Sequence, residues 1–223
     1  GGNEIISVYD ENADFWRTLD ETRGFSGQII TDMEADSEFV WIASSSGISR
    51  LNQRSKRENP IGFEKMFNHV YIFDIELVNN QLWIASNYEL TIIDLNEENV
   101  KNFKRIGSLD DMEGMEDVLT GFKVLEHYKN QLIVSTNHGV WSFDLISKSW
   151  KALVDASVFA GREITSMIRF KNFIFMATND GFIRYDIKDR FIRDYHYDFL
   201  GQIHDMNVDK KHLWLGTSNG IIK

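Results

Sequence analysis

The sequence contains no cysteine and only one proline among its 223 residues. The lack of cysteine excludes disulfide bonds, thiolate metal sites and thiol nucleophiles. No apolar run approaches the ~18 residues that a membrane-spanning helix needs, so we expect no membrane span. Basic residues are also scarce, with 24 Lys and Arg against 34 Asp and Glu, giving a formal net charge of −10. Such a charge repels phosphate backbones, and we expect no nucleic-acid partner.

Apolar and aromatic residues are plentiful, at 43% and 13% of the chain. These fractions predict a folded chain with a buried core, and the length suits a single domain spanning residues 1–223.

One short apolar phrase recurs five times along the chain. Its large central residues are spaced by 42, 50, 42 and 39 residues. They are Trp41, Trp83, Ile133, Phe175 and Trp214. A second apolar residue stands 11 positions before each of them. These preceding residues are Ile30, Ile72, Phe122, Ile164 and Ile203. Eleven positions after the first four stand Asn52, Asp94, Asp144 and Asp186. Constant offsets within copies of varying spacing identify a true internal repeat.

Each copy reads as four short strands. An alternating segment comes first, then the apolar phrase, a turn that usually contains glycine, a third strand ending at Asn or Asp, and a shorter aromatic strand. The second copy lacks the turn glycine at Asn87-Tyr88-Glu89, so its turn is expected to differ. Four antiparallel strands every ~42 residues predict an all-β fold, the β-propeller. The expected blades span approximately residues 28–66, 70–105, 120–154 and 162–196.

The two ends of the chain supply the remaining strands. Residues 1–20 resemble third and fourth strands, because Asp10 precedes Trp16 by six residues just as Asp144 precedes Trp150. Residues 201–223 supply strands one and two and the start of a third, so both ends together predict one composite blade. However, Ile5–Val8 and Gly220–Lys223 would then both occupy the third-strand position of that blade. Two alternatives stay open, a closed five-bladed ring and a fragment of a larger propeller.

The repeats resemble the two-component regulator propeller repeat. The segments that carry this resemblance are Leu213–Lys223, reading LWLGTSNGIIK, and Ala177–Asp186, reading ATNDGFIRYD. In that family, such propellers form the periplasmic sensor region of bacterial hybrid histidine kinases, and many recognise glycans. Related repeats occur in propellers of bacterial surface and secretion machinery. The resemblance thus implies a sensor role in signal transduction and a periplasmic or extracellular location.

Three aspartates occupy the same repeat position, two residues after the first apolar residue of their copies. They are Asp32, Asp74 and Asp205. On the innermost strand of a blade, they are candidates for binding a cation or sugar hydroxyls around a central channel. The alternative is a structural role, in which each carboxylate accepts hydrogen bonds from neighbouring backbone amides.

The longest spacing between copies adds about eight residues within the acidic segment 106–119. Its acidic residues are Asp110, Asp111, Glu113, Glu116 and Asp117. A loop between blades overhangs one face of a propeller, where partners commonly bind, so this segment is a candidate partner loop. A solvated acidic turn is the alternative.

No nucleophile, phosphate-loop or metalloprotease motif occurs in the sequence. We therefore expect no catalytic residues, no metal and no cofactor. The expected function is non-catalytic binding of a saccharide, another small ligand or a protein partner. The alternatives are a protein-interaction scaffold of a surface or secretion assembly, and a glycan-processing enzyme with two carboxylates brought together from different blades.

Overall fold

The computed structural model describes residues 6–10, 14–19, 29–53, 67, 69–87, 89–95, 103–106 and 121–223. This part of the chain is all-β apart from one 3-10 turn, η4 (Ala156–Phe159). None of its helical segments is long and apolar enough to cross a membrane. The chain divides into two compact units, residues 1–113 and 114–223, which are described separately.

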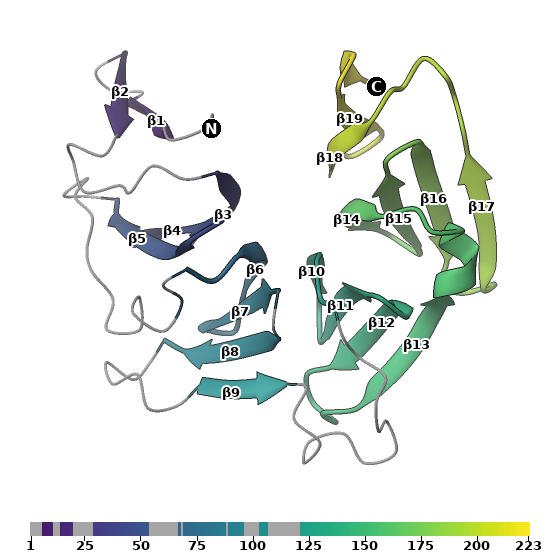
Figure 1. Cartoon of the computed structure of the whole chain (residues 1–223), viewed down its shortest axis with the longest axis horizontal. Coiled ribbons are helices and arrows are strands. Elements are labelled where there is room, and N and C mark those ends of the chain that lie inside the picture. The colour runs from purple at the N-terminus through teal and green to yellow at the C-terminus, as the bar shows by residue number, and fades with distance from the viewer. Residues whose placement is uncertain are drawn as a thin grey trace. The chain divides into compact units, whose positions relative to one another are not determined.

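The first unit contains three antiparallel sheets (Figure 1). A hairpin of β1 (Ile6–Asp10) and β2 (Phe15–Leu19) comes first. The second sheet comprises β3 (Ile30–Ala35), β4 (Phe39–Ser44) and β5 (Gly47–Asn52). The third comprises β6 (Ile72–Val78), β7 (Gln81–Ser86), β8 (Leu90–Asp94) and β9 (Phe103–Ile106).

The second unit also contains three antiparallel sheets. The first comprises β10 (Leu125–Tyr128), β11 (Gln131–Thr136), β12 (Gly139–Asp144) and β13 (Trp150–Asp155). The next comprises β14 (Ile164–Phe170), β15 (Phe173–Thr178), β16 (Gly181–Asp186) and β17 (Phe191–Tyr195). The last comprises β18 (Ile203–Val208), β19 (Leu213–Thr217) and β20 (Gly220–Ile222). Within each sheet every strand pairs with the next in sequence, so the predicted antiparallel order of strands within a copy is confirmed where the strands are described.

Equivalent residues of the five copies occupy equivalent positions in their sheets. The five large apolar residues all lie on the second strand of their sheets, and Trp41, Trp83 and Ile133 are almost completely buried. In four sheets the first apolar residue of the copy pairs with the hydroxyl residue that ends the second strand, as Ile30 does with Ser44. A one-residue bulge follows each of these pairs. A bulge bends its strand and strengthens its twist, so all four first strands bend at the same repeat position.

A hydroxyl group closes every hairpin between the second and third strands. The side chain of the last second-strand residue donates to the carbonyl three residues later, at 3.0 Å in all five copies. The donors are Ser44, Ser86, Thr136, Thr178 and Thr217. The acceptor is a glycine with positive φ in four copies and Glu89 in the second. The hairpin that lacks glycine therefore keeps the same closing bond.

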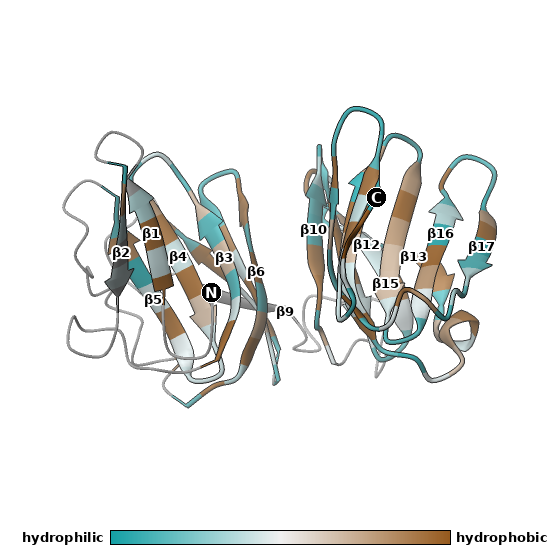
Figure 2. Cartoon of the chain, turned by 90° about the horizontal axis from the view of Figure 1, so that it is seen from above, coloured by the Kyte–Doolittle hydropathy of each residue, from teal (hydrophilic) through white to brown (hydrophobic). Residues whose placement is uncertain are grey.

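Neighbouring sheets pack face to face within each unit. In the second unit, one cluster joins Ile133 and Val140 to Met176 and Ile183 of the following sheet. Figure 1 shows β10, β14 and β18 along one side of this unit, and β13 and β17 along the other. Figure 2 shows hydrophobic residues along the strands and hydrophilic residues at many of the connecting loops. Where two sheets meet in this way, their facing apolar side chains are removed from water.

The β1–β2 hairpin has the register expected from its spacing. Tyr9 pairs with Trp16, as Phe143 pairs with Trp150 in the second unit. Ile6 of this hairpin packs against Ile42 and Leu51 of the β3–β5 sheet. Within the described residues, β1 and β2 pair only with each other, and β18–β20 form a sheet of their own. The composite blade thus stays a prediction, and the fourth strand expected within 54–66 lies outside the described residues.

Candidate functional site

The structure brings two of the three predicted aspartates together in the first unit. Asp32 Oδ2 accepts a hydrogen bond from the backbone N–H of Ile75 at 3.1 Å, and Asp74 Oδ1 lies 3.0 Å from the same nitrogen. Asp32 thereby links β3 to β6, the first strands of consecutive sheets. Both carboxylates are half-buried and make the backbone contacts expected of a structural role.

The third aspartate belongs to the second unit. Asp205 Oδ1 accepts hydrogen bonds from the N–H of Met206 at 2.8 Å and from the hydroxyl of Ser166 at 3.1 Å. Ser166 occupies the aspartate position of its own copy, so a neutral donor replaces the second carboxylate there. Thr165 adds a bond from its hydroxyl to the carbonyl of Ile203. Ligand binding by Asp32, Asp74 and Asp205 stays a prediction.

A further acidic position in the repeat was missed in the sequence analysis. Glu34, Glu76 and Glu126 each lie four residues after the first apolar residue of their copy. Glu126 Oε1 accepts a hydrogen bond from the N–H of Arg169 at 2.8 Å, which links β10 to β14. Burial, with the nearby charge of Asp32, raises the pKa of Glu34 to about 7. A search for carboxylates at constant repeat positions would have found all three glutamates.

The predicted partner loop belongs to the part of the chain that the structure does not describe. Its residues Asp110, Asp111, Glu113, Glu116 and Asp117 lie outside the described residues. Among the residues that are described, no group of three or more His, Asp or Glu side chains could hold a metal ion.

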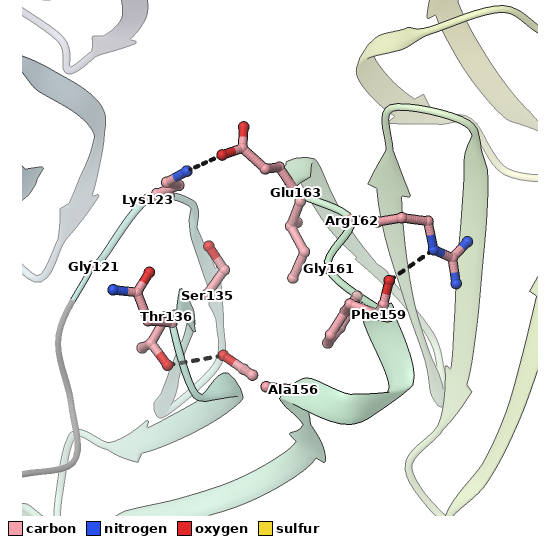
Figure 3. Close-up of a pocket in the computed structure, with 12 residues that line it drawn as sticks. Gly121, Lys123, Ser135, Thr136, Ala156, Phe159, Gly161, Arg162 and Glu163 are labelled. Carbon is pink, nitrogen blue, oxygen red and sulfur yellow. Dashed lines mark hydrogen bonds and ion pairs between the residues drawn. The ribbon is translucent and has the colours of Figure 1, made fainter.

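A cavity of about 330 Å³ lies in the second unit, between the β10–β13 and β14–β17 sheets (Figure 3). It is built by the segments leading into β10 and β14, the β11–β12 hairpin and η4. The lining residues are Gly121, Lys123, Ser135, Thr136, Asn137, Gly139, Ala156, Phe159, Gly161, Arg162, Glu163 and Ile164.

One wall of the cavity is fixed to β11 by backbone and hydroxyl bonds. Ser135 accepts a hydrogen bond from the N–H of Val124 with its Oγ at 2.8 Å and is itself buried. Gly121 has a φ of +69°, and a Cβ there would lie 2.2 Å from Asn137 Oδ1. Glycine at this position therefore allows the amide of Asn137 to lie against the segment leading into β10.

The opposite wall begins with η4, which Asp155 caps by accepting a hydrogen bond from the N–H of Ser157. Phe159 is buried beneath the cavity. Arg162 donates from Nε to the carbonyl of Phe159 at 2.9 Å and points away from the cavity (Figure 3). Its guanidinium reaches both carboxylate oxygens of Asp194 on β17, so this wall is anchored to the outer strand.

The charges around the cavity are balanced. Lys123 Nζ and Glu163 Oε1 point toward each other from opposite walls and lie 2.9 Å apart (Figure 3). Burial opposes ionisation of Asp194, but hydrogen bonds from Arg162 and His196 outweigh it and lower the pKa of Asp194. Asp194 therefore stays charged and neutralises Arg162. The polar groups of the lining, apart from Arg162, are the Lys123–Glu163 pair, hydroxyls, an amide and backbone atoms.

The fold resembles that of several solved structures. The extracellular domain of BT4673 from B. thetaiotaomicron, assigned as a hybrid two component system, is 15% identical with a TM-score of 0.66, over 97% of this chain and 27% of that one. PorZ of Porphyromonas gingivalis, a surface component of the type-IX secretion system, is 13% identical with a TM-score of 0.65, over 97% and 28%. The Neurospora crassa Pan2 WD40 domain is 10% identical with a TM-score of 0.59, over 84% and 56%.

These likenesses show the fold alone, which is that of β-propeller blades. This chain spans little more than a quarter of the length of the first two proteins. No protein-family model and no curated protein matches its sequence.

Proposed function

We propose that the chain is a non-catalytic, ligand-binding part of a β-propeller, and that its ligand occupies the cavity between the β10–β13 and β14–β17 sheets. The observation that supports this proposal is the lining of the cavity. It combines a buried aromatic floor at Phe159 with the Asn137 amide and the Lys123–Glu163 pair. A concave site with an apolar floor and a few placed polar groups is typical of small-ligand pockets.

A saccharide fits this lining best. The volume of about 330 Å³ suits a ligand of one or two sugar rings. The lysine and glutamate compensate each other, so the lining favours an uncharged molecule with many hydroxyls. The likeness to an extracellular domain of a hybrid two component system supports a sensor role in signal transduction and a periplasmic or extracellular location.

The test is ligand-induced stabilisation. Thermal unfolding of the wild-type chain is measured with neutral mono- and disaccharides, uronic acids and amino acids. A ligand of the cavity raises Tm in the wild type and loses this effect in Lys123→Gln and Asn137→Ala. Lys151→Gln is the matched control, since Lys151 is exposed on β13 and does not line the cavity. A rise in Tm that persists in both cavity variants would contradict the position of the site. If no compound of the panel raises Tm in the wild type, saccharide binding is contradicted.

A protein-interaction scaffold is the second candidate. The likeness to PorZ, a secretion-system surface component, favours it, as does the acidic segment 106–119. Replacing Asp110, Asp111 and Glu113 by Asn or Gln is then expected to abolish co-purification of a partner without lowering Tm.

The chemistry of this cavity favours non-catalytic binding over the glycan-processing alternative. Glycoside hydrolysis needs two carboxyl groups about 5–10 Å apart. The cavity lining contributes one, Glu163, which is paired with Lys123. Release of nitrophenol from nitrophenyl glycosides, abolished by Glu163→Gln, would overturn the non-catalytic assignment.

A further inference from the structure

Two arginines lie directly opposite each other on neighbouring strands of the second unit. Arg184 on β16 pairs in register with Arg193 on β17. Like charges directly opposite on an antiparallel pair destabilise a sheet. This arrangement occurs in a chain with ten more acidic than basic residues, so acidic partners are not scarce.

Neither guanidinium forms an ion pair within the described part of the chain. Arg184 instead lies over the rings of Phe173 and Tyr195, with its Cζ 4.8 and 6.0 Å from their centroids. Arg193 lies 5.6 Å from the centroid of Phe191. Stacking of this kind leaves the edges of a guanidinium group, which carry its N–H donors, free to meet an anion.

One carboxylate on the same face of β16 is engaged in backbone hydrogen bonds. Asp186 stands two residues beyond Arg184, but its Oδ1 accepts hydrogen bonds from the N–H groups of Lys188 and Asp189. Asp194 points to the other face, where it binds Arg162. Neither of these carboxylates therefore forms an ion pair with the two arginines.

The fold does not require this pair. In the preceding sheet, Ser142 and Lys151 occupy the equivalent paired positions on β12 and β13. In the β6–β9 sheet, Ile92 pairs with Lys104 at these positions. Both sheets form four antiparallel strands with the same connections. Of these three sheets, only the β14–β17 sheet has two arginines facing each other at these positions.

The face around the pair is aromatic and partly exposed. The row Phe175–Arg184–Arg193 crosses β15, β16 and β17, and the next rows end at Phe191 and Tyr195. Phe175 packs against the following sheet, whereas Arg193 is exposed and Phe191 is 54% exposed. β17 is also the last strand of its sheet, and no described strand pairs with its outer edge.

We propose that this face binds an extended acidic polypeptide segment of a partner protein. The segment lies along the outer edge of β17 and exchanges backbone hydrogen bonds with it, as in strand addition. An acidic residue opposite Arg193 continues the Phe175–Arg184–Arg193 row, and its carboxylate compensates both guanidinium groups. Side chains alternate along a strand, so the residues two positions to either side face the Phe191 and Tyr195 rows. The recognised pattern is apolar-x-acidic-x-apolar.

The free edge of β17 favours a polypeptide over other anions. A backbone can use the outward N–H and C=O groups of this strand, whereas a saccharide or an inorganic anion meets only the arginines. This surface is separate from the cavity, because none of its residues lines that site. The two proposals can therefore fail independently.

The test uses a short fluorescein-labelled peptide in which threonine alternates with phenylalanine. A central glutamate replaces one phenylalanine, so the nearest phenylalanines stand two positions away on either side. Fluorescence anisotropy is expected to show binding to the wild-type chain that weakens as salt increases. A peptide with glutamine in place of glutamate, and the variants Arg184→Gln and Arg193→Gln, should each weaken binding about tenfold or more. Lys151→Gln, the equivalent position in the preceding sheet, should leave the affinity unchanged.

Arg193→Glu separates recognition from structure. It replaces a like-charge pair by an opposite-charge pair, so Tm should rise while peptide binding is lost. A lower Tm in this variant, or equal binding of the glutamate and glutamine peptides, would overturn the proposal. Stronger binding of polygalacturonate, or of sulfate with no peptide effect, would also overturn it in favour of another anion.

Discussion

Asp32 on β3 and Ile75 on β6 are joined across two consecutive sheets by a carboxylate-to-amide hydrogen bond of 3.1 Å. The second unit has a similar bond of 2.8 Å between Glu126 and the N–H of Arg169. In both cases the two residues are 43 positions apart in the sequence. An acidic side chain on one first strand thus satisfies a backbone donor on the next.

Removal of this bond should destabilise the first unit. Asp32→Ala removes one of the two carboxylate acceptors of the Ile75 amide, and we expect a loss of about 1–3 kcal/mol in the free energy of unfolding. Urea denaturation measures the loss. Asp198→Ala is the control, because Asp198 is an exposed aspartate of the second unit. Equal destabilisation by both changes would contradict the role of the bond.

Stability should fall as the pH rises from about 4.5 to about 7, because of Glu34. Burial and the charge of Asp32 raise the pKa of Glu34 to about 7, above its value of 4.5 in an unfolded chain. The folded state therefore binds the proton more tightly in this window, so the free energy of unfolding declines across it and levels off above about pH 7.

Glu34→Gln should remove this decline in stability. We expect the variant to be more stable than the wild type at pH 8, on the order of 1 kcal/mol after allowing for solvent screening, or roughly 2–4 °C in Tm. At pH 4 the two proteins should differ little. Thermal unfolding at both pH values measures the difference in Tm between the variant and the wild type. A difference that does not grow with pH would argue against a raised pKa of Glu34.

The hydroxyl bond that closes each hairpin should matter most where it is buried. Thr178 is completely buried, and its Oγ1 donates to the carbonyl of Gly181, so Thr178→Val should cost about 1–3 kcal/mol. Thr217 makes the same bond to Gly220 in a less buried position. Thr217→Val should therefore cost less, and denaturant unfolding of the two variants compares them. A larger cost for Thr217→Val would contradict this explanation.

Gly121 should be required for the position of Asn137. Gly121→Ala places a Cβ about 2.2 Å from Asn137 Oδ1 at a φ of +69°, whereas Gly161→Ala, at a φ of +82°, meets no atom within 4 Å. Both changes strain the backbone, but only the first also displaces a side chain. We therefore expect the larger loss of Tm for Gly121→Ala.

A double-mutant cycle isolates the steric contribution of Asn137 to the loss of stability in Gly121→Ala. In an Asn137→Ala background, the extra cost of Gly121→Ala over Gly161→Ala should largely disappear. A cost that persists unchanged would show that the Asn137 contact does not explain the glycine.

The fold was predictable because the repeat encodes register. The constant offset between Ile30 and Trp41, reproduced in every copy, places both residues on adjacent strands, and the bulge after Ile30 accounts for the position of Asp32. Likewise, the six residues from Asp10 to Trp16 predict the Tyr9–Trp16 pair. Such patterns arise because the chain repeats one local geometry.

The cavity was not predictable in the same way. Its walls come from η4 and the linker through Glu163, where the copies differ in length and sequence and no repeat signal exists. The anchoring of Arg162 by Asp194 joins residues 32 positions apart, from the segment leading into β14 to β17 of the same sheet, and no constant spacing in the sequence marks it. The pairing of Arg184 with Arg193 follows from the hairpin, but its lack of a carboxylate partner requires the three-dimensional arrangement.

The equal separation of the Asp32–Ile75 and Glu126–Arg169 bonds has a consequence for how such a chain grows. At each of these two junctions the earlier copy supplies a carboxylate acceptor and the later copy a backbone N–H donor, and a backbone donor does not depend on the side chain of its residue. A tandem duplication of either acidic copy would therefore carry this one contact into the new junction without a compensating substitution.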